Sequence, residues 1–167
     1  MLNPYLGQNK YNMLQEQLKT DLIIAMKAKD PERVSTLRFL LSAINNKQIE
    51  LQRDLTDEDV VGVIGHQIKE RKESIEAFTA GNRQDLVDKE KHEMEILSGY
   101  MPEQMPEREL EQVVNQVIKE TGASSPADFG KVMGMVMARV KGKADGNKVG
   151  GIVKKQLKSF RASRRRI

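Results

Sequence analysis

The segment 129–158 is rich in lysine and glycine, two residue types that together suit the binding of phosphate groups. It reads FGKVMGMVMARVKGKADGNKVGGIVKKQLK, and Gly142 and Gly146 flank an expected helix start at Asp145. Glycine lets backbone N–H groups come close to a phosphate, and the N-terminus of a helix attracts negative charge. The residues that we predict to contact RNA are Lys131, Arg139, Lys141, Gly142, Lys143, Gly146 and Lys148.

The positive charge is concentrated towards the end of the chain. Residues 1–99 carry 14 Lys or Arg and 17 Asp or Glu, whereas residues 100–167 carry 14 and 7. Such a surface holds a polyanion mainly through the release of counterions. Because the carboxylate of Asp145 competes for N–H donors and repels phosphate, we expect the surrounding cations to contribute more than the turn. A solvated tail that includes residues 164–166, all arginine, is the alternative explanation of this charge.

Catalytic groups are sparse in the sequence. His66 and His92 fall in charged helical patterns, and the single pair of His66 with Glu70 supplies too few ligands for a closed metal site. The other acids alternate with lysine and arginine, as is typical of a solvated helix face. There is no cysteine and no GxSxG, GxxxxGK[ST] or GxGxxG motif. The sequence therefore predicts no catalytic residue, no metal site and no cofactor.

The composition favours an all-α protein. Charged residues make up 31% of the 167 residues and aromatic residues only 4%, which favours helices over strands. No run approaches the roughly 18 apolar residues of a membrane span, and residues 1–12 lack the apolar centre of a signal peptide. The absence of cysteine also suits a reducing compartment. We therefore expect a cytoplasmic protein with no membrane partner.

Apolar periodicity predicts about four helices in the first hundred residues. Asp30-Pro31 marks the start of the second helix, Thr56 caps the third, and Gly81-Asn82 ends the third. A fourth helix is expected from about Arg83 to Leu97. The face that the first helix is expected to bury carries Leu14, Leu18, Leu22, Ile23 and Met26.

Residues 99–106 interrupt the helical pattern with glycine and two prolines, and we expect a linker there. Three shorter helices follow, the first ending at Thr121-Gly122 and the last capped by Asp145. Their methionines, Met133, Met135 and Met137, are expected to fill the core. The predicted organisation is an N-terminal helical domain at 13–98, a linker at 99–106, a small C-terminal three-helix domain at 107–160, and flexible ends at 1–12 and 161–167.

Several motifs, taken in order, resemble the YqeY family of small bacterial proteins. They are LxxDLxxAMKAKD and RxSTLRxLLSAI within residues 18–44, LTDEDV at 55–60, IKERKESIEAF at 68–78, and GKVMGxxM followed by KGKADG within residues 130–146. The resemblance spans about residues 13–158, which makes Met13 a candidate initiator. The last third is similar to the tail domain of the B subunit of the glutamine-dependent aspartyl/glutamyl-tRNA amidotransferase.

The resemblance implies two helical bodies, the second of which contacts the body of tRNA in the amidotransferase. Glutamine hydrolysis and ATP-dependent activation belong to parts of that enzyme with no counterpart in this chain. We therefore interpret the chain as a non-catalytic accessory protein that binds tRNA or another structured RNA through its C-terminal domain. Two alternatives stay open. One is an amidotransferase-related protein, a carbon–nitrogen ligase with glutamine as amido-N donor that acts with partner subunits or another translation-related protein. The other is a protein-interaction module that uses the acidic N-terminal helices.

Overall fold

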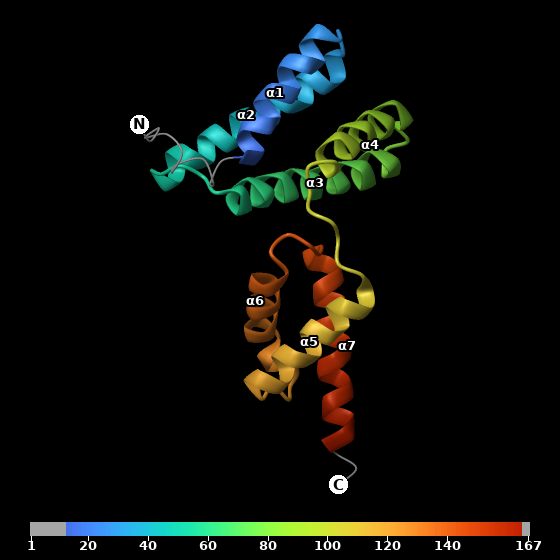
Figure 1. The fold of residues 1–167 in the computed structure, drawn as a ribbon. Coiled ribbons are helices and arrows are strands. Elements are labelled where there is room, and N and C mark those ends of the chain that lie inside the picture. Colours follow the sequence, from blue (N-terminus) through green and yellow to red (C-terminus); the bar gives the residue numbers. More distant parts are fainter. Residues whose placement is uncertain (1–12, 165–167) are drawn as a thin grey trace, which may run out of the picture. The chain divides into compact units, whose positions relative to one another are not determined.

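The computed structural model describes residues 13–164 of the chain, and their side chains as far as residue 159. This part of the chain forms seven α-helices and one 3-10 turn, and it contains no strand (Figure 1). The prediction of an all-α fold with four helices followed by three is confirmed. Contacts divide the chain into two compact units, Met1–Met101 and Pro102–Ile167, and the division falls inside the segment expected to be a linker.

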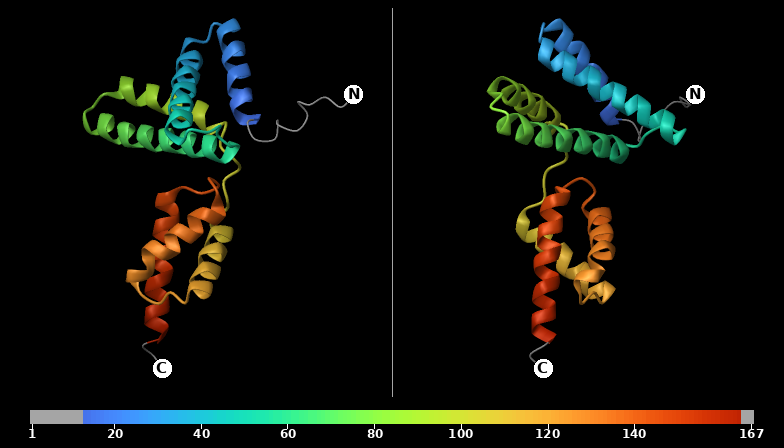
Figure 2. Two further views of the ribbon diagram at one scale, coloured as in Figure 1. Left: turned by 90° about the vertical axis from the view of Figure 1, so that its left-hand side faces the viewer. Right: turned by 180° about the vertical axis from the view of Figure 1, so that it is seen from behind.

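The N-terminal unit consists of two helical hairpins (Figures 1 and 2). Helices α1 (Met13–Lys27) and α2 (Pro31–Leu51) form the first hairpin, and α3 (Asp57–Ala80) and α4 (Gln84–Ser98) form the second. All four helices contribute to one core or pack against its edge. The buried members of this core are Leu18, Leu37, Leu40, Ile44, Leu55, Val60, Ile64, Leu97 and Tyr100.

Local caps determine where α2 and α3 begin. The Asp30 carboxylate accepts a hydrogen bond of 3.0 Å from the Arg33 N–H, and Pro31 occupies the first turn. At α3, Thr56 Oγ1 accepts from the Asp59 N–H at 3.2 Å while Asp59 Oδ2 accepts from the Thr56 N–H at 2.8 Å. This reciprocal capping box satisfies donors that the first turn of the helix leaves unpaired.

The buried face of α1 is narrower than its apolar pattern suggests. Ile23 is 53% exposed and Met26 is 50% exposed, so these two members of the predicted apolar face lie outside the core. Each residue advances an α-helix by about 100°, and the neighbours of α1 cover only the side that carries Leu18 and Ala25. Ala25, which the sequence did not single out, is buried in their place.

Both ends of the expected linker at 99–106 are bonded to the units that they join. Tyr100 is buried in the N-terminal core, and its hydroxyl donates to Asp21 Oδ2 at 2.7 Å. Burial raises the pKa of Tyr100, so the hydroxyl keeps its proton as a donor. At the other end, the Met105 N–H donates to the Lys143 carbonyl at 2.7 Å, within the C-terminal unit.

The C-terminal unit contains α5 (Glu107–Thr121), the 3-10 turn η1 (Pro126–Asp128), α6 (Phe129–Val140) and α7 (Gly146–Arg164). The side chains of Met133 and Met137 pack against its core as expected, whereas Met135 is 37% exposed and does not. The core is built mainly from Leu110, Val114, Val117, Ile118, Val132, Val136, Val140, Val149, Val153 and Leu157.

The expected flexible ends fall only partly within the described residues. Residues 161–164 form the last turn of α7. Residues 1–12 and 165–167 lie outside the part of the chain that the structure describes.

We predict that Asp59→Asn lowers the free energy of unfolding at pH 7 by about 1 kcal/mol, because the capping box loses its charged acceptor. Hydrogen bonds from Arg53 and Thr56 lower the pKa of the Asp59 carboxyl in the folded protein. Its stabilising contribution is therefore complete above the ordinary Asp pKa of about 4 and declines as the pH falls below that value. Urea unfolding at pH 7, 4 and 2.5 should show a shrinking difference between wild type and variant. A difference independent of pH would contradict this prediction.

We also predict that endoproteinase Glu-C cuts first after Glu103. This glutamate is exposed, and it lies between Tyr100, which is buried in one core, and Met105, which is bonded to the other unit. The many helical glutamates become accessible only after local unfolding, which slows cleavage there. Mass spectrometry of the first fragments measures the order, and Glu103→Gln should remove the early cut. Earlier cleavage at a helical glutamate would show that the connection is protected.

Candidate nucleic-acid interface

The turn between α6 and α7 has a fixed backbone. Lys141 and Gly142 adopt φ values of 42° and 78°, both left-handed, and the Lys143 N–H donates to the Val140 carbonyl at 2.8 Å. The segment before α5 lies against this turn, since the side-chain amide of Gln104 donates to the Gly142 carbonyl at 3.2 Å. These bonds hold the residues around Lys141 and Lys143 in one arrangement.

Asp145 caps α7 as the sequence predicts. Its Oδ1 accepts from the Asn147 N–H at 2.8 Å, and its carbonyl accepts from the Val149 N–H at 3.0 Å. The N–H groups of Lys141 and Lys143 also donate within the protein. Three backbone donors of the region, at residues 141, 143 and 147, are thus engaged, so recognition of phosphate here depends mainly on side-chain charge.

The predicted contact residues fall into two places rather than one. Lys141, Gly142 and Lys143 form the turn, with Arg139 just before it and Gly146 and Lys148 just after it. Gly146 is half-buried, and an added Cβ would lie 3.9 Å from the Met137 methyl group, so this glycine packs against the core. Lys131 lies in the first turn of α6, about 15 Å along the helix from the turn at a rise of about 1.5 Å per residue.

Acids on α5 neutralise two of the predicted cations. Arg139 forms an ion pair with Glu120 and lowers the pKa of that carboxyl. The ammonium group of Lys148 lies 3.6 Å from Glu107. These pairs are exposed and therefore weak, but they reduce the positive potential that Arg139 and Lys148 offer to a polyanion.

Lys154 is a further cation that the sequence interpretation missed. Its ammonium group lies 5.5 Å from the centre of the Phe129 ring, in cation–π geometry. Phe129 is the first residue of α6 and lies two positions before Lys131 in the chain. Lys155, next to Lys154, pairs with Glu111 at 3.8 Å. The spacing of Gly150, Lys154 and Lys158 along one side of α7 is the sequence signal that could have identified Lys154.

The exposed face of α6 carries two glycines one helical turn apart. Gly130 and Gly134 are exposed, and a Cβ built on either meets no atom within 4 Å. A glycine within a helix costs roughly 1 kcal/mol relative to alanine. Packing inside the protein therefore does not explain these two glycines, and a bound chain could approach the helix backbone closely beside Lys131.

Metal-binding and membrane-spanning features are absent from the described part of the chain. His66 Nδ1 lies 3.6 Å from Glu70, but no group of three or more histidine, aspartate or glutamate side chains within residues 13–164 could hold a metal ion. Among the same residues, no helix is both long and apolar enough to cross a bilayer.

The sequence model of the Yqey-like protein family matches residues 15–157. The chain belongs to this YqeY family. The match covers both helical units, including α6, the turn and most of α7. The resemblance inferred from the motifs is therefore confirmed.

Curated relatives of the chain include proteins named altered inheritance of mitochondria protein 41, mitochondrial. The protein of Lachancea thermotolerans is 46% identical over 85 residues, which is 50% of this chain and 46% of the relative. That of Saccharomyces cerevisiae strain YJM789 is 40% identical over 100 residues, 59% of this chain and 54% of the relative. That of Kluyveromyces lactis is 44% identical over 84 residues, 50% of this chain and 45% of the relative. The chain thus spans about half the length of the curated relatives that it matches.

The names of these relatives contradict the expectation of a cytoplasmic protein, because they place the relatives in mitochondria. The expectation was based on the lack of an apolar signal segment. Mitochondrial transit peptides are amphipathic rather than apolar, so that observation does not distinguish the cytoplasm from the mitochondrion.

We predict that Asp145→Ala lowers the free energy of unfolding by about 1 kcal/mol without RNA present, because the Asn147 N–H loses its acceptor. Asp145→Asn is the matched control. It keeps an acceptor and should stay near wild-type stability, while the loss of negative charge should tighten RNA binding. Thermal unfolding followed by circular dichroism measures the stabilities. Equal stabilities of all three proteins would mean that other bonds organise the start of α7.

Proposed function

We propose that the protein is a non-catalytic accessory factor that binds structured RNA, tRNA first among the candidates, through its C-terminal unit. One observation carries the proposal: lysines from α6, the turn and α7 gather on a small unit in which only some of them are neutralised. Lys131 and Lys143 are exposed, and no acidic side chain among the described residues forms an ion pair within 4 Å with either. Hydrogen bonds from Ser124 and Ser125 and, to a lesser extent, the charge of Lys131 lower the pKa of the Asp128 carboxyl, so Lys131 is only partly neutralised. The match to the YqeY family across this unit supports the same conclusion.

The two lysine-bearing places suit a folded RNA better than a short single strand. Lys131 lies at the start of α6, and the ammonium group of Lys154 on α7 lies near the Phe129 ring there, whereas Lys141 and Lys143 lie beyond the end of α6. Phosphates on neighbouring backbone segments of a duplex can meet both places, and the glycines of α6 let the helix approach the duplex. Recognition of this kind depends on RNA shape more than on base sequence.

The names of the relatives favour mitochondrial RNA as the ligand. Their printed names place them in mitochondria, so mitochondrial tRNA is the first ligand to test. Among the described residues no set of side chains supports a carbon–nitrogen ligase step, and the proposal does not extend to amidotransferase activity.

Binding of transcribed tRNA by the full chain tests this function. With about three to five phosphates neutralised, log K against log[salt] should have a slope near −3 to −4. Lys131→Ala and Lys143→Ala should each reduce the slope by about one unit. Arg139→Ala should change it less, because Glu120 already neutralises that guanidinium. Lys47→Ala in the N-terminal unit is the matched control and should change nothing.

A second control separates this surface from the terminal arginines. Removal of residues 165–167 takes away two arginines without touching α6 or the turn. If tRNA binding disappears on that removal but survives the joint change Lys131→Ala/Lys143→Ala, the proposed surface is wrong.

Gly134→Ala provides an independent prediction. Alanine should raise the free energy of unfolding by about 1 kcal/mol, because it favours the helix and meets no neighbouring atom. The same methyl group should weaken tRNA binding by holding the RNA backbone away from α6. Gly62→Ala in α3 is the control, since it is equally exposed and open and should stabilise without affecting RNA. Undiminished affinity of Gly134→Ala would exclude close approach at this face.

A further inference from the structure

A groove of about 540 Å³ lies between α2, α3 and α4 of the N-terminal unit. Phe39 of α2, Gln67 and Arg71 of α3, and Glu90 and Glu93 of α4 are among its lining residues. Most of these side chains are polar, and several are well buried: Gln67 is 4% exposed and Glu93 is 9% exposed. The groove therefore has a polar floor built into the core of the unit.

The charged groups of the floor are paired with one another. Arg71 Nη1 lies 2.8 Å from Glu90 Oε2 and also forms an ion pair with Glu93. The Arg71 side chain is only 11% exposed. Two carboxylates on α4 thus bind the same guanidinium nitrogen, Arg71 Nη1, and this arrangement connects α3 to α4.

Two buried atoms in the same floor have no hydrogen-bond partner. They are Gln67 Oε1 and Arg71 Nε, and they are the only such side-chain atoms among the described residues. Gln67 Oε1 is an acceptor and Arg71 Nε carries a donor N–H. The two residues are one helical turn apart on α3. Because folded proteins satisfy nearly all buried polar groups, such a pair within a groove indicates a missing partner.

Charge restricts the class of that partner. An anion would satisfy Arg71 but would face the carboxylates of Glu70, Glu90 and Glu93. Lys89 also lines the groove, 3.9 Å from Glu93, so three carboxylates there stand against two cations. A cation would satisfy Gln67 but would lie against Arg71. The main chain of a peptide offers N–H donors and carbonyl acceptors and introduces no charge, so it can satisfy both atoms.

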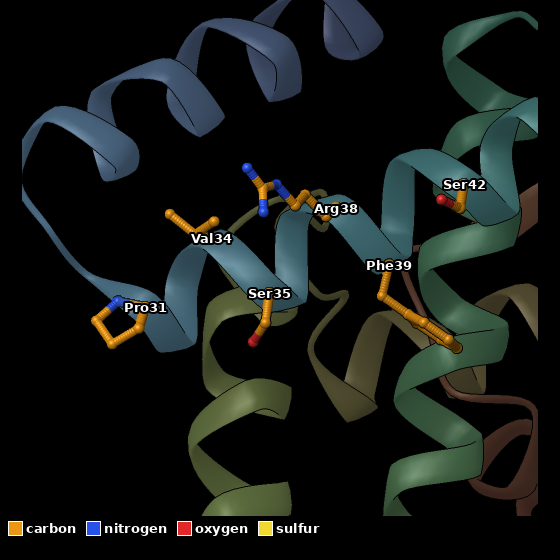
Figure 3. Close-up of a pocket in the computed structure, with 6 residues that line it drawn as sticks. All are labelled: Pro31, Val34, Ser35, Arg38, Phe39 and Ser42. Carbon is orange, nitrogen blue, oxygen red and sulfur yellow. The ribbon is translucent and has the colours of Figure 1, made fainter.

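Phe39 supplies an apolar contact beside this polar floor. It is 61% exposed, although it is a large aromatic residue. It also lines a second hollow along α2 (Figure 3), and the two hollows share Ser35 and Phe39. The combined surface is long enough to contact more than one residue of an extended chain.

We propose that this groove binds an extended, uncharged segment of a partner protein. A main-chain N–H of the segment donates to Gln67 Oε1, a main-chain carbonyl of the segment accepts from the N–H at Arg71 Nε, and a neighbouring apolar side chain packs on Phe39. Both polar atoms are buried from solvent, so binding includes a movement of the Gln67 and Arg71 side chains. A nucleobase has a similar donor and acceptor edge, but its strand would bring phosphates beside three carboxylates.

A displayed library of short random linear peptides, selected on the full chain and counter-selected on Phe39→Ser, tests the proposal. The enriched peptides are then synthesised, and their affinities are measured by calorimetry. Phe39→Ser should weaken binding by about tenfold, as expected for an aromatic anchor. Ile49→Ser is the matched control, because Ile49 is a 68% exposed apolar residue elsewhere on α2, and it should leave affinity unchanged.

Gln67→Met distinguishes a binding role from a structural one. Methionine removes the unpaired acceptor at similar size, so the melting temperature without ligand should stay the same or rise. Peptide affinity should nevertheless fall. A lower melting temperature would show that Gln67 serves the fold, and this outcome would overturn the proposal.

Three other outcomes would also overturn it. They are a selection without enriched peptides, peptides that bind Phe39→Ser as tightly as wild type, and an adenine oligonucleotide that binds the groove in place of peptides. The tRNA affinity of Phe39→Ser should equal that of wild type. This measurement keeps the result separate from the proposed RNA function.

Discussion

The reversal of the chain at Lys141 and Gly142 is the constraint on which the C-terminal unit depends. Gly142 adopts its left-handed conformation freely, but Lys141 does so at a cost on the order of 1 kcal/mol. Hydrogen bonds from Gln104 and Met105 to the carbonyls of residues 142 and 143 help to hold the turn. The reversal lets α6 and α7 share a core while both present lysines to solvent, so the same geometry determines packing and surface charge.

Local signals in the sequence were sufficient to locate the helices. The caps at Thr56 and Asp145 depend only on residues within one helical turn, so their side-chain type and spacing predicted them correctly. The pairing of Arg139 with Glu120 could not be predicted in this way, because it joins residues 19 positions apart and depends on how α5 packs against α6. Periodicity likewise identified the inner face of α1, but not that its neighbours leave Ile23 exposed.

The features most relevant to function are those that folding alone does not favour. Gly134 weakens a helix without any packing need for a glycine. Gln67 and Arg71 leave a buried acceptor and a buried donor without partners. The sequence shows both features, as a glycine in a helical pattern and as polar residues four positions apart. Only the structure shows that no contact inside the protein compensates for either feature. A contact from a ligand is the physical basis of the groove proposal, and it adds to the RNA proposal, which rests mainly on the lysines.

Charge assigns the two proposed ligands to different units. Residues 100–167 have an excess of seven basic residues, whereas the first 99 residues have an excess of three acidic residues. A polyanion gains from the first distribution and is repelled by the second, particularly near Glu70, Glu90 and Glu93. The groove between α2, α3 and α4 therefore disfavours the RNA that we propose binds the C-terminal unit. The negative potential of the N-terminal unit neither attracts nor repels a neutral peptide segment. The proposed peptide and the proposed RNA therefore do not compete for one surface.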